Sequence, residues 1–160
     1  MHANTRETVP EGEHTFHPLV PEELEFVKKM WFDDQASRAL GMEVLTLALE
    51  DGLGRARLRM PVGDLMVNGH DTCHGGDIFT FCDSAFAMAC NAKGSITLAA
   101  GCDINYVSPA RRGDVLIADA IERVQYGRNG ITDVTVTREA DGELIAEFRG
   151  RSRTLAPRKA

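Results

Sequence analysis

The chain has 160 residues, of which 43% are hydrophobic and 26% charged, a composition typical of a globular domain with its own core. Its formal net charge of -6 argues against a general nucleic-acid binder, because such proteins present a basic face. No apolar run reaches the length of a membrane span and the N-terminal segment lacks the apolar region of a secretory signal, so we expect a cytoplasmic protein with no membrane partner.

The N-terminal part predicts a tail followed by helices. Residues 1–18 are polar and rich in His, Glu and Thr, and we expect them to be mobile, whereas residues 19–156 are expected to form one domain. From Pro21 the sequence PEELEFVKKMWF has helical spacing, with proline at its start and acids in the first turn. A second short helix is expected next, capped by Asp33 or Asp34.

The hydrophobic period then changes from helical to alternating. Residues 42–50 predict a strand, and after the turn DGLG the segment 55–62 alternates apolar residues with arginines, which indicates a hairpin with one solvent face. After a long central helix, further strands are predicted at about 97–107, 115–125, 132–138 and 144–154. This order predicts an α+β fold in which one antiparallel sheet wraps a helix.

The stretch 68–94 joins a polar, glycine-rich loop to the central helix, predicted at about 77–92. Because this helix is apolar on nearly every side, it is expected at the centre of the fold. Asp83 lies in its middle, where a buried carboxylate needs partners or takes a raised pKa. It is either bonded to the backbone or to a neighbour such as Ser84 or Asn91, or it has a chemical task. The glycine-rich loop at the start of the helix favours a chemical role for Asp83.

The start of this helix is a candidate anion site. His74, Gly75 and Gly76 stand where the first helical N–H groups lack acceptors and the helix dipole is positive, although a glycine pair is more often only a tight turn. Eight residues separate Gly75 from Asp83, roughly 12 Å along a helix, which is too far for both to touch one reacting atom. We therefore infer that two copies meet, with Asp83 of one chain facing the glycine end of the other. Acyl transfer needs such a pairing of carboxylate and anion site.

Other chemistries fit the same loop less well. His70, Cys73 and His74 have the residue types of a metal site, but structural zinc takes two separated ligand pairs and no second pair exists, so no metal is expected. A Cys73 thiolate with His74 as its base is disfavoured, because adjacent residues of an extended loop point apart. The loop lacks the ending of a phosphate-binding P-loop, so no nucleotide cofactor is expected. The remaining cysteines are expected as small buried apolar residues without disulfides: Cys82, Cys90 and Cys102.

The central stretch resembles the signature of hotdog-fold acyl-CoA thioesterases, most closely the bacterial thioesterases of phenylacetate degradation. Four segments carry the likeness: NGH, CHGG, DSAFA, which begins at Asp83, and ACN. It extends over residues 31–153 and includes ASRALGM, NYVSPARRGD and EFRGRS.

The resemblance implies a hotdog fold, with a long central helix wrapped by a curved antiparallel sheet, chains paired through one continuous sheet, and a tetramer of two such pairs. It implies an active site across the dimer interface, where the Gly75 N–H polarises the thioester carbonyl and Asp83 acts as general base or nucleophile. Asn68 is implied to position water or the carbonyl, and His74 to steady the loop. Substrate and CoA contacts are implied at Gly76, Arg111, Arg112 and Arg128.

Two departures from the family pattern limit what is carried over. Related enzymes often have asparagine at the position of Asp33, which is therefore given no catalytic role, and no serine stands near Ala99 or Ala100 to assist deacylation. The leading hypothesis is a cofactor-free homo-oligomer that hydrolyses phenylacetyl-CoA or a ring-hydroxylated relative. The alternatives are a hotdog hydratase or dehydratase using His74 and Asp83, and a non-catalytic acyl-CoA binder or metal-responsive module.

Overall fold

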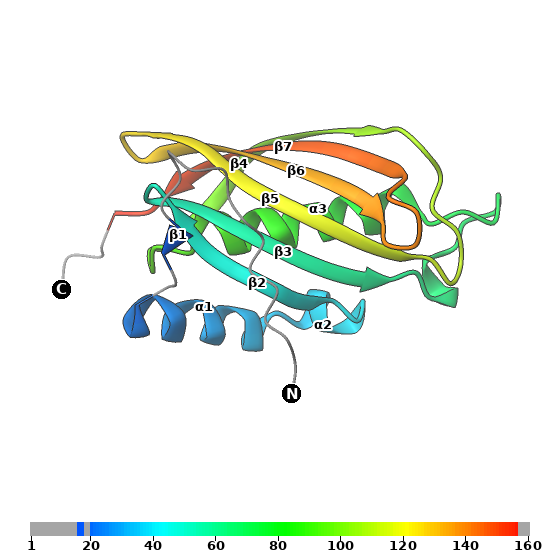
Figure 1. Cartoon of the computed structure of the whole chain (residues 1–160), viewed down its shortest axis with the longest axis horizontal. Coiled ribbons are helices and arrows are strands. Elements are labelled where there is room, and N and C mark those ends of the chain that lie inside the picture. Colours follow the sequence, from blue (N-terminus) through cyan, green and yellow to red (C-terminus); the bar gives the residue numbers. More distant parts are fainter. Residues whose placement is uncertain (1–15, 18–19, 157–160) are drawn as a thin grey trace.

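A computed structural model describes residues 16–17 and 20–156. The strands are β1 (Phe16–His17), β2 (Glu43–Glu50), β3 (Leu53–Pro61), β4 (Thr97–Tyr106), β5 (Val115–Tyr126), β6 (Asn129–Arg138) and β7 (Leu144–Thr154), and the helices are α1 (Pro21–Asp33), α2 (Gln35–Ala39), α3 (Gly75–Cys90) and the short 3-10 helix η1 (Asp64–Met66). The strands form one antiparallel sheet in the order β1-β2-β3-β5-β6-β7-β4. The sheet curves around α3, and α1 runs along its β2 edge (Figure 1). The predicted α+β fold is confirmed.

The two N-terminal helices lie where they were predicted. Asp34, one of the two candidate caps, begins α2, because its carboxylate accepts a hydrogen bond from the Ser37 N–H at 2.9 Å. The tail expected at residues 1–18 lies outside the described residues except for β1, which pairs with the end of β2. None of the helices in the described ranges combines the length and apolar character needed to cross a bilayer.

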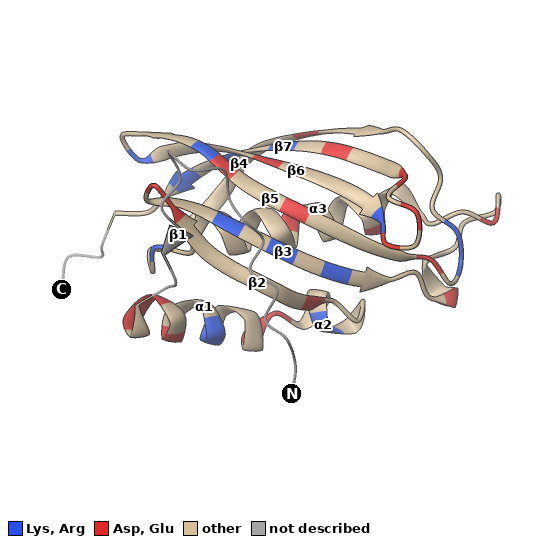
Figure 2. Ribbon diagram, viewed as in Figure 1, with Lys and Arg blue, Asp and Glu red and all other residues tan. Residues whose placement is uncertain are grey.

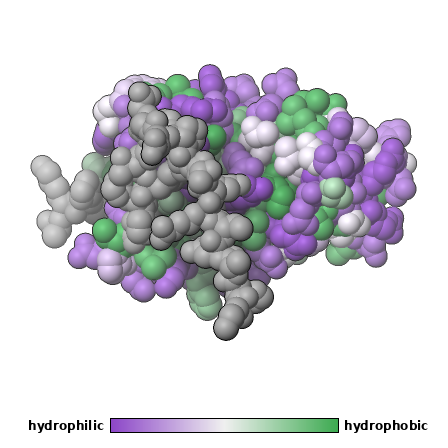
Figure 3. All heavy atoms as spheres, viewed as in Figure 1, coloured by the Kyte–Doolittle hydropathy of each residue, from purple (hydrophilic) through white to green (hydrophobic). Residues whose placement is uncertain are grey.

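The outer face of the sheet, opposite α3, is polar. Alternation in β3 places Ala56, Leu58 and Met60 in the core, while Arg57 pairs with Asp119 of β5 and Arg59 with Glu43 of β2. Basic positions recur along β3 (Figure 2). This confirms the predicted hairpin with one solvent face. Hydrophilic residues predominate on this side of the molecule, and hydrophobic residues form only separate patches (Figure 3).

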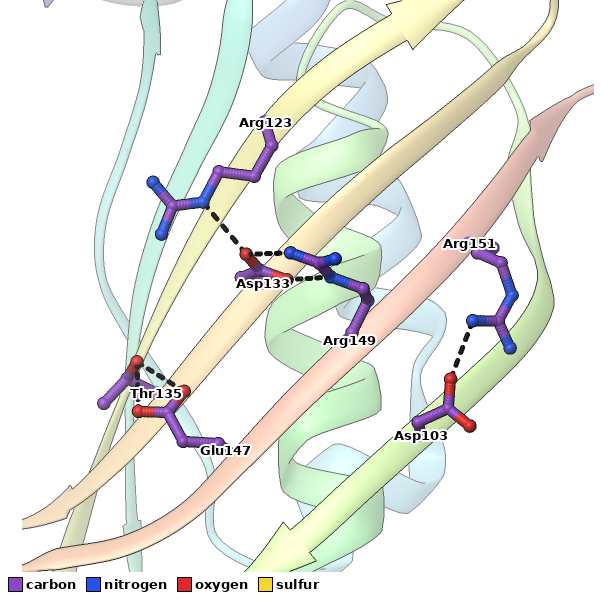
Figure 4. Close-up of polar contacts among 7 residues, drawn as sticks. All are labelled: Asp103, Arg123, Asp133, Thr135, Glu147, Arg149 and Arg151. Carbon is purple, nitrogen blue, oxygen red and sulfur yellow. Dashed lines mark hydrogen bonds and ion pairs between the residues drawn. The ribbon is translucent and has the colours of Figure 1, made fainter.

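Cross-strand ion pairs organise the outer face around β6 and β7. Asp133 accepts hydrogen bonds from Arg149 at 2.6 Å and Arg123 at 3.1 Å (Figure 4). The bond from Arg149, reinforced by Arg123, holds the pKa of Asp133 below its usual value. Arg151 pairs with Asp103 on β4 at 2.7 Å in the same view. These charged side chains of the outer face therefore satisfy one another.

The central helix begins at Gly75, two residues earlier than predicted, and ends at Cys90. It packs closely against the sheet because glycines face it. A Cβ atom at Gly54 of β3 would lie 1.8 Å from the Ala89 carbonyl oxygen. On this side the buried Phe86 ring meets the Phe148 ring of β7 at a centroid distance of 5.9 Å.

The opposite side of α3 is not covered by the sheet. Gly76, Thr80, Asp83 and Ala87 recur three or four residues apart, and each remains partly or fully exposed. Residues at this spacing share one face of a helix. We call these four residues the open stripe. Helix α3 is central, as predicted, but one chain leaves this stripe of it partly uncovered.

Candidate active site

The loop before α3 is closed by Asn68. Its side-chain oxygen accepts hydrogen bonds from the His70 N–H at 2.9 Å, the Thr72 N–H at 3.3 Å and the Thr72 hydroxyl at 3.1 Å. These bonds fold residues 68–72 into a compact turn. Since the oxygen is occupied within the loop, the NH₂ group of Asn68 is the part that can meet a ligand.

Two backbone bonds anchor the end of this loop. The Cys73 N–H donates to the Ala110 carbonyl oxygen at 2.7 Å, and the His74 N–H donates to the Met66 carbonyl oxygen at 2.7 Å. The loop is thereby held between η1 and the β4–β5 connection. This connection also carries Arg111 and Arg112, so the fold brings both arginines beside the start of α3.

The first backbone groups of α3 are divided among specific partners. His74 is the N-cap, and its Nδ1 accepts a hydrogen bond from the Gly76 N–H at 3.1 Å. The Tyr106 hydroxyl donates to the Gly75 carbonyl oxygen at 2.8 Å. Among the described residues, the Gly75 N–H has no acceptor. An unpaired amide at the positive end of a helix dipole is a donor for a developing oxyanion.

Asp83 has no hydrogen-bond or ion-pair partner among the described residues. Ser84, one of its expected partners, bonds instead to the buried Ser37 at 2.7 Å, and Asn91 bonds to backbone groups at 2.9 Å. The interpretation of Asp83 as a carboxylate held by Ser84 or Asn91 is therefore wrong. Burial, followed by the nearby charge of Asp34, raises the pKa of Asp83. A carboxylate that is half-buried without a partner is poised to accept a proton.

An apolar groove begins one helical turn beyond Asp83. It encloses about 670 Å³ between α1, the second half of α3 and the start of β4. Its apolar walls are Phe26, Met30, Ala87, Ile96 and Leu98. Ala87 belongs to the open stripe, so the groove continues from the carboxylate along the same face of α3. This groove is large enough for the apolar part of a small ligand.

The three predicted CoA-binding arginines do not come together in one chain. Arg112 lies beside the loop before α3, where it pairs with Asp64 at 3.1 Å and with Asp71 at 3.7 Å. Arg128 lies in the β5–β6 turn, whereas Arg112 precedes the start of β5. A strand of this length spans roughly 35 Å, so the two ends are far apart. Arg128 can join the others only through a second chain.

The loop also carries His70, Cys73 and His74, which were considered for metal binding and thiolate chemistry. No group of three or more metal-ligating side chains gathers among the residues that the structure describes. Burial, followed by the charge of Asp77, raises the pKa of the Cys73 thiol to about 11, so the thiolate is scarce at neutral pH. Asp33, to which no catalytic role was assigned, is exposed, pairs with Lys29 at 2.5 Å and lines the apolar groove beside α1.

Tyr106 is the site residue that sequence reasoning missed. It is the last residue of β4, it is 52% exposed, and it contacts the start of α3. It falls in the segment NYVSPARRGD, which was noted for its family likeness only. Nothing in the sequence distinguishes an exposed strand tyrosine from one that reaches a helix 31 residues away.

A curved antiparallel sheet around one long helix, with a free amide at the start of that helix and a partnerless carboxylate two turns later, defines a hotdog-fold protein with a site suited to acyl transfer. The chain belongs to the thioesterase superfamily, whose family model matches residues 70–145.

Comparison with known proteins supports this assignment over most of the chain. The chain is 35% identical over 126 residues to the acyl-coenzyme A thioesterase PaaI of Escherichia coli K12, covering 79% of this chain and 86% of that protein. Human acyl-coenzyme A thioesterase 13 is 31% identical over 127 residues, covering 78% of this chain and 89% of that protein. The structure of the E. coli PaaI protein, from the phenylacetic acid degradation operon, is similar with a TM-score of 0.79 at 32% identity, over 87% of this chain and 97% of that one.

Proposed function

We propose that this thioesterase-superfamily enzyme hydrolyses acyl-CoA thioesters, with phenylacetyl-CoA or hydroxyphenylacetyl-CoA as substrate, to the free acid and CoA. The observation that carries the proposal is the partnerless Asp83 on the same helix as the unpaired Gly75 amide. The thioester class follows from the family. The aromatic acyl group rests on the likeness to the E. coli PaaI protein of the phenylacetic acid degradation operon.

In the proposed reaction, Gly75 acts on the carbonyl oxygen of the thioester and Asp83 acts at its carbonyl carbon. The Gly75 N–H donates to the carbonyl oxygen and stabilises the negative charge that develops there. The Asp83 carboxylate either takes a proton from water, which attacks the carbonyl carbon, or attacks that carbon itself. In the first case the C–S bond breaks and the proton taken from water passes to the CoA sulfur. In the second case the C–S bond breaks as a mixed anhydride with Asp83 forms; water then hydrolyses the anhydride, which frees the acid and Asp83 and supplies the proton of the CoA thiol. His74 holds the first turn of α3, and the NH₂ group of Asn68 orients the water or the carbonyl.

The two groups are proposed to come from different chains. Within one helix they lie roughly 12 Å apart along the axis, beyond contact with a common atom. The open stripe offers a face on which a second copy can place its own helix, so that Asp83 of each chain meets Gly75 of the other. We propose a dimer on this basis and a dimer of dimers by family likeness.

The substrate is proposed to lie between the open stripe of one chain and the start of α3 of the other. Its acyl group occupies the apolar groove that starts at Ala87, and its CoA phosphates meet Arg111 and Arg112 beside the loop. Arg112 then exchanges its carboxylate partners for phosphate, which is a strong acceptor for guanidinium. Gly76 lines the approach, and Arg128 contributes only from a neighbouring chain. The expected cytoplasmic location belongs to this proposal and rests on the sequence alone.

The test measures thiol release from phenylacetyl-CoA and a panel of other acyl-CoA esters. General base catalysis contributes roughly 10²-fold or more, so Asp83→Ala is expected to lower kcat/KM by at least that factor. Wild-type rates in Asp83→Ala would overturn the proposal. Loss of the crotonyl-CoA double bond without thiol release would instead support the hydratase alternative.

A pair of substitutions isolates the Gly75 amide. Gly75→Pro and Gly75→Ala both add a Cβ atom, but only proline removes the N–H. Proline is suited to the first helical position, and the extended His74 backbone, with φ -61° and ψ 133°, fits a residue before proline. We expect kcat for Gly75→Pro to be roughly 10²-fold lower than for Gly75→Ala, as for loss of one oxyanion donor. Equal rates would exclude the amide from catalysis.

A further inference from the structure

Tyr106 joins the end of β4 to the first residue of α3. Its hydroxyl donates to the Gly75 carbonyl oxygen at 2.8 Å. Its ring lies so close that a Cβ atom at Gly75 would stand 3.0 Å from both Cζ and the hydroxyl oxygen. Glycine at position 75 is therefore matched to a tyrosine at position 106, since any side chain there would have to displace the ring.

Three neighbouring backbone groups at the start of α3 differ in their hydrogen bonding. The Gly76 N–H is taken by His74 at 3.1 Å, and the Gly75 carbonyl oxygen receives the Tyr106 hydroxyl. Between these two fixed points the Gly75 N–H has no acceptor in the described parts of the chain. The cap and the tyrosine thus restrain the residue on both sides while they leave its amide hydrogen available.

An oxyanion donor needs such restraint. The first turn of a helix has the fewest backbone hydrogen bonds and opens most readily. A catalytic donor, by contrast, works only when it is held within roughly 0.5 Å of its productive position. We propose that Tyr106 is a positioning residue for thioester hydrolysis, which fixes the Gly75 amide at the place where the substrate carbonyl oxygen binds. The inference rests on the proposed function of Gly75.

The chain supplies a matched control for this role. It contains two tyrosines, Tyr106 and Tyr126, and both are 52% exposed. Tyr126 ends β5 at the β5–β6 turn, far from the start of α3. We expect Tyr106→Phe to lower kcat for phenylacetyl-CoA by roughly tenfold with little change in KM, because misplacing a catalytic group slows the chemical step more than binding. Tyr126→Phe is expected to leave both constants unchanged.

A double substitution separates positioning from general support of the fold. Gly75→Ala and Gly75→Pro are the two backgrounds, because both add the Cβ atom that presses on the Tyr106 ring and only proline removes the amide hydrogen. If Tyr106 acts through the amide, Tyr106→Phe lowers kcat in the Gly75→Ala background and has no further effect in the Gly75→Pro background. If its role is only structural, the same fold-loss appears in both backgrounds, and the inference is wrong. Thermal unfolding of each variant checks that the proteins compared are folded.

The outcomes also distinguish this inference from the proposed function. A large loss in Gly75→Pro relative to Gly75→Ala, together with wild-type kcat in Tyr106→Phe, would overturn the role of Tyr106 and leave that of Gly75 intact. Equal activity of the two Gly75 variants would overturn both. A loss in Tyr106→Phe that persists in the Gly75→Ala background and disappears in the Gly75→Pro background supports the inference.

Discussion

Replacement of Gly54 by alanine is expected to push α3 away from β3. The added Cβ would lie 1.8 Å from the Ala89 carbonyl oxygen and 2.6 Å from the Ala89 carbonyl carbon, both backbone atoms of α3. The Gly54 N–H also donates to the buried Glu122 carboxylate at 2.9 Å, so strand movement strains that bond as well. Overpacking usually costs roughly 1–3 kcal/mol, and collision with backbone places this case near about 3 kcal/mol. For a chain of this length that corresponds to a fall in Tm of roughly 6–12 °C.

The assay is thermal unfolding at fixed protein concentration, with Gly63→Ala as the matched control. No atom lies within 4 Å of a Cβ added at Gly63, and its φ of -89° suits alanine. Gly63→Ala is therefore expected to unfold close to the wild type. If Gly54→Ala unfolds at the same temperature as Gly63→Ala, the close contact between α3 and β3 described above is incorrect.

Three further predictions concern the titrating groups of the site. Because burial and the charge of Asp34 raise the pKa of Asp83, activity is expected to fall on acidification at a higher pH than it would with an exposed aspartate. Asp34→Asn removes this charge and should move the acidic limb of the kcat/KM profile to lower pH. An equal shift in Asp33→Asn would argue against a specific influence of Asp34 on Asp83. The stability given by protonated Asp83 is fully present below pH 3.8, the usual pKa of an aspartate, and is lost as the pH rises through the raised pKa of Asp83 in the folded protein. Asp83→Asn should therefore raise Tm at pH 7 while activity falls, and a lower Tm would contradict this. Cys73→Ala should keep most of the activity, because the thiol pKa of about 11 leaves little thiolate at neutral pH. A folded but inactive Cys73→Ala variant would instead favour Cys73 as the nucleophile.

Much of the fold was predictable because local pattern determined it. Alternation located the strands, and the apolar run located α3. The errors arose at the ends of elements. Helix α3 begins at Gly75 because the His74 ring caps it, a bond that propensity does not predict. Strand β6 begins at Asn129, three residues before the predicted start, because Gly127 adopts φ 58° and allows a tight β5–β6 turn.

The site was predictable to the extent that it is local. Gly75 and Asp83 share one helix and one motif, so the proposal that they act together could be made from their spacing alone. Tyr106 reaches Gly75 across the fold, and no local pattern encodes that contact. Arg128 and Arg112 lie at opposite ends of β5, and where each strand end lies is set by the topology of the sheet, which no local pattern encodes.

The most direct test of a site shared between chains is subunit complementation. Asp83→Ala and Gly75→Pro proteins, each of low activity, are mixed under conditions that exchange subunits and assayed with phenylacetyl-CoA. In a mixed dimer one site carries both defects and the other carries none, so with random exchange activity should recover to about a quarter of the wild-type value. Activity no greater than the average of the two parent proteins, with subunit exchange confirmed, would contradict a site built from Asp83 of one chain and Gly75 of the other.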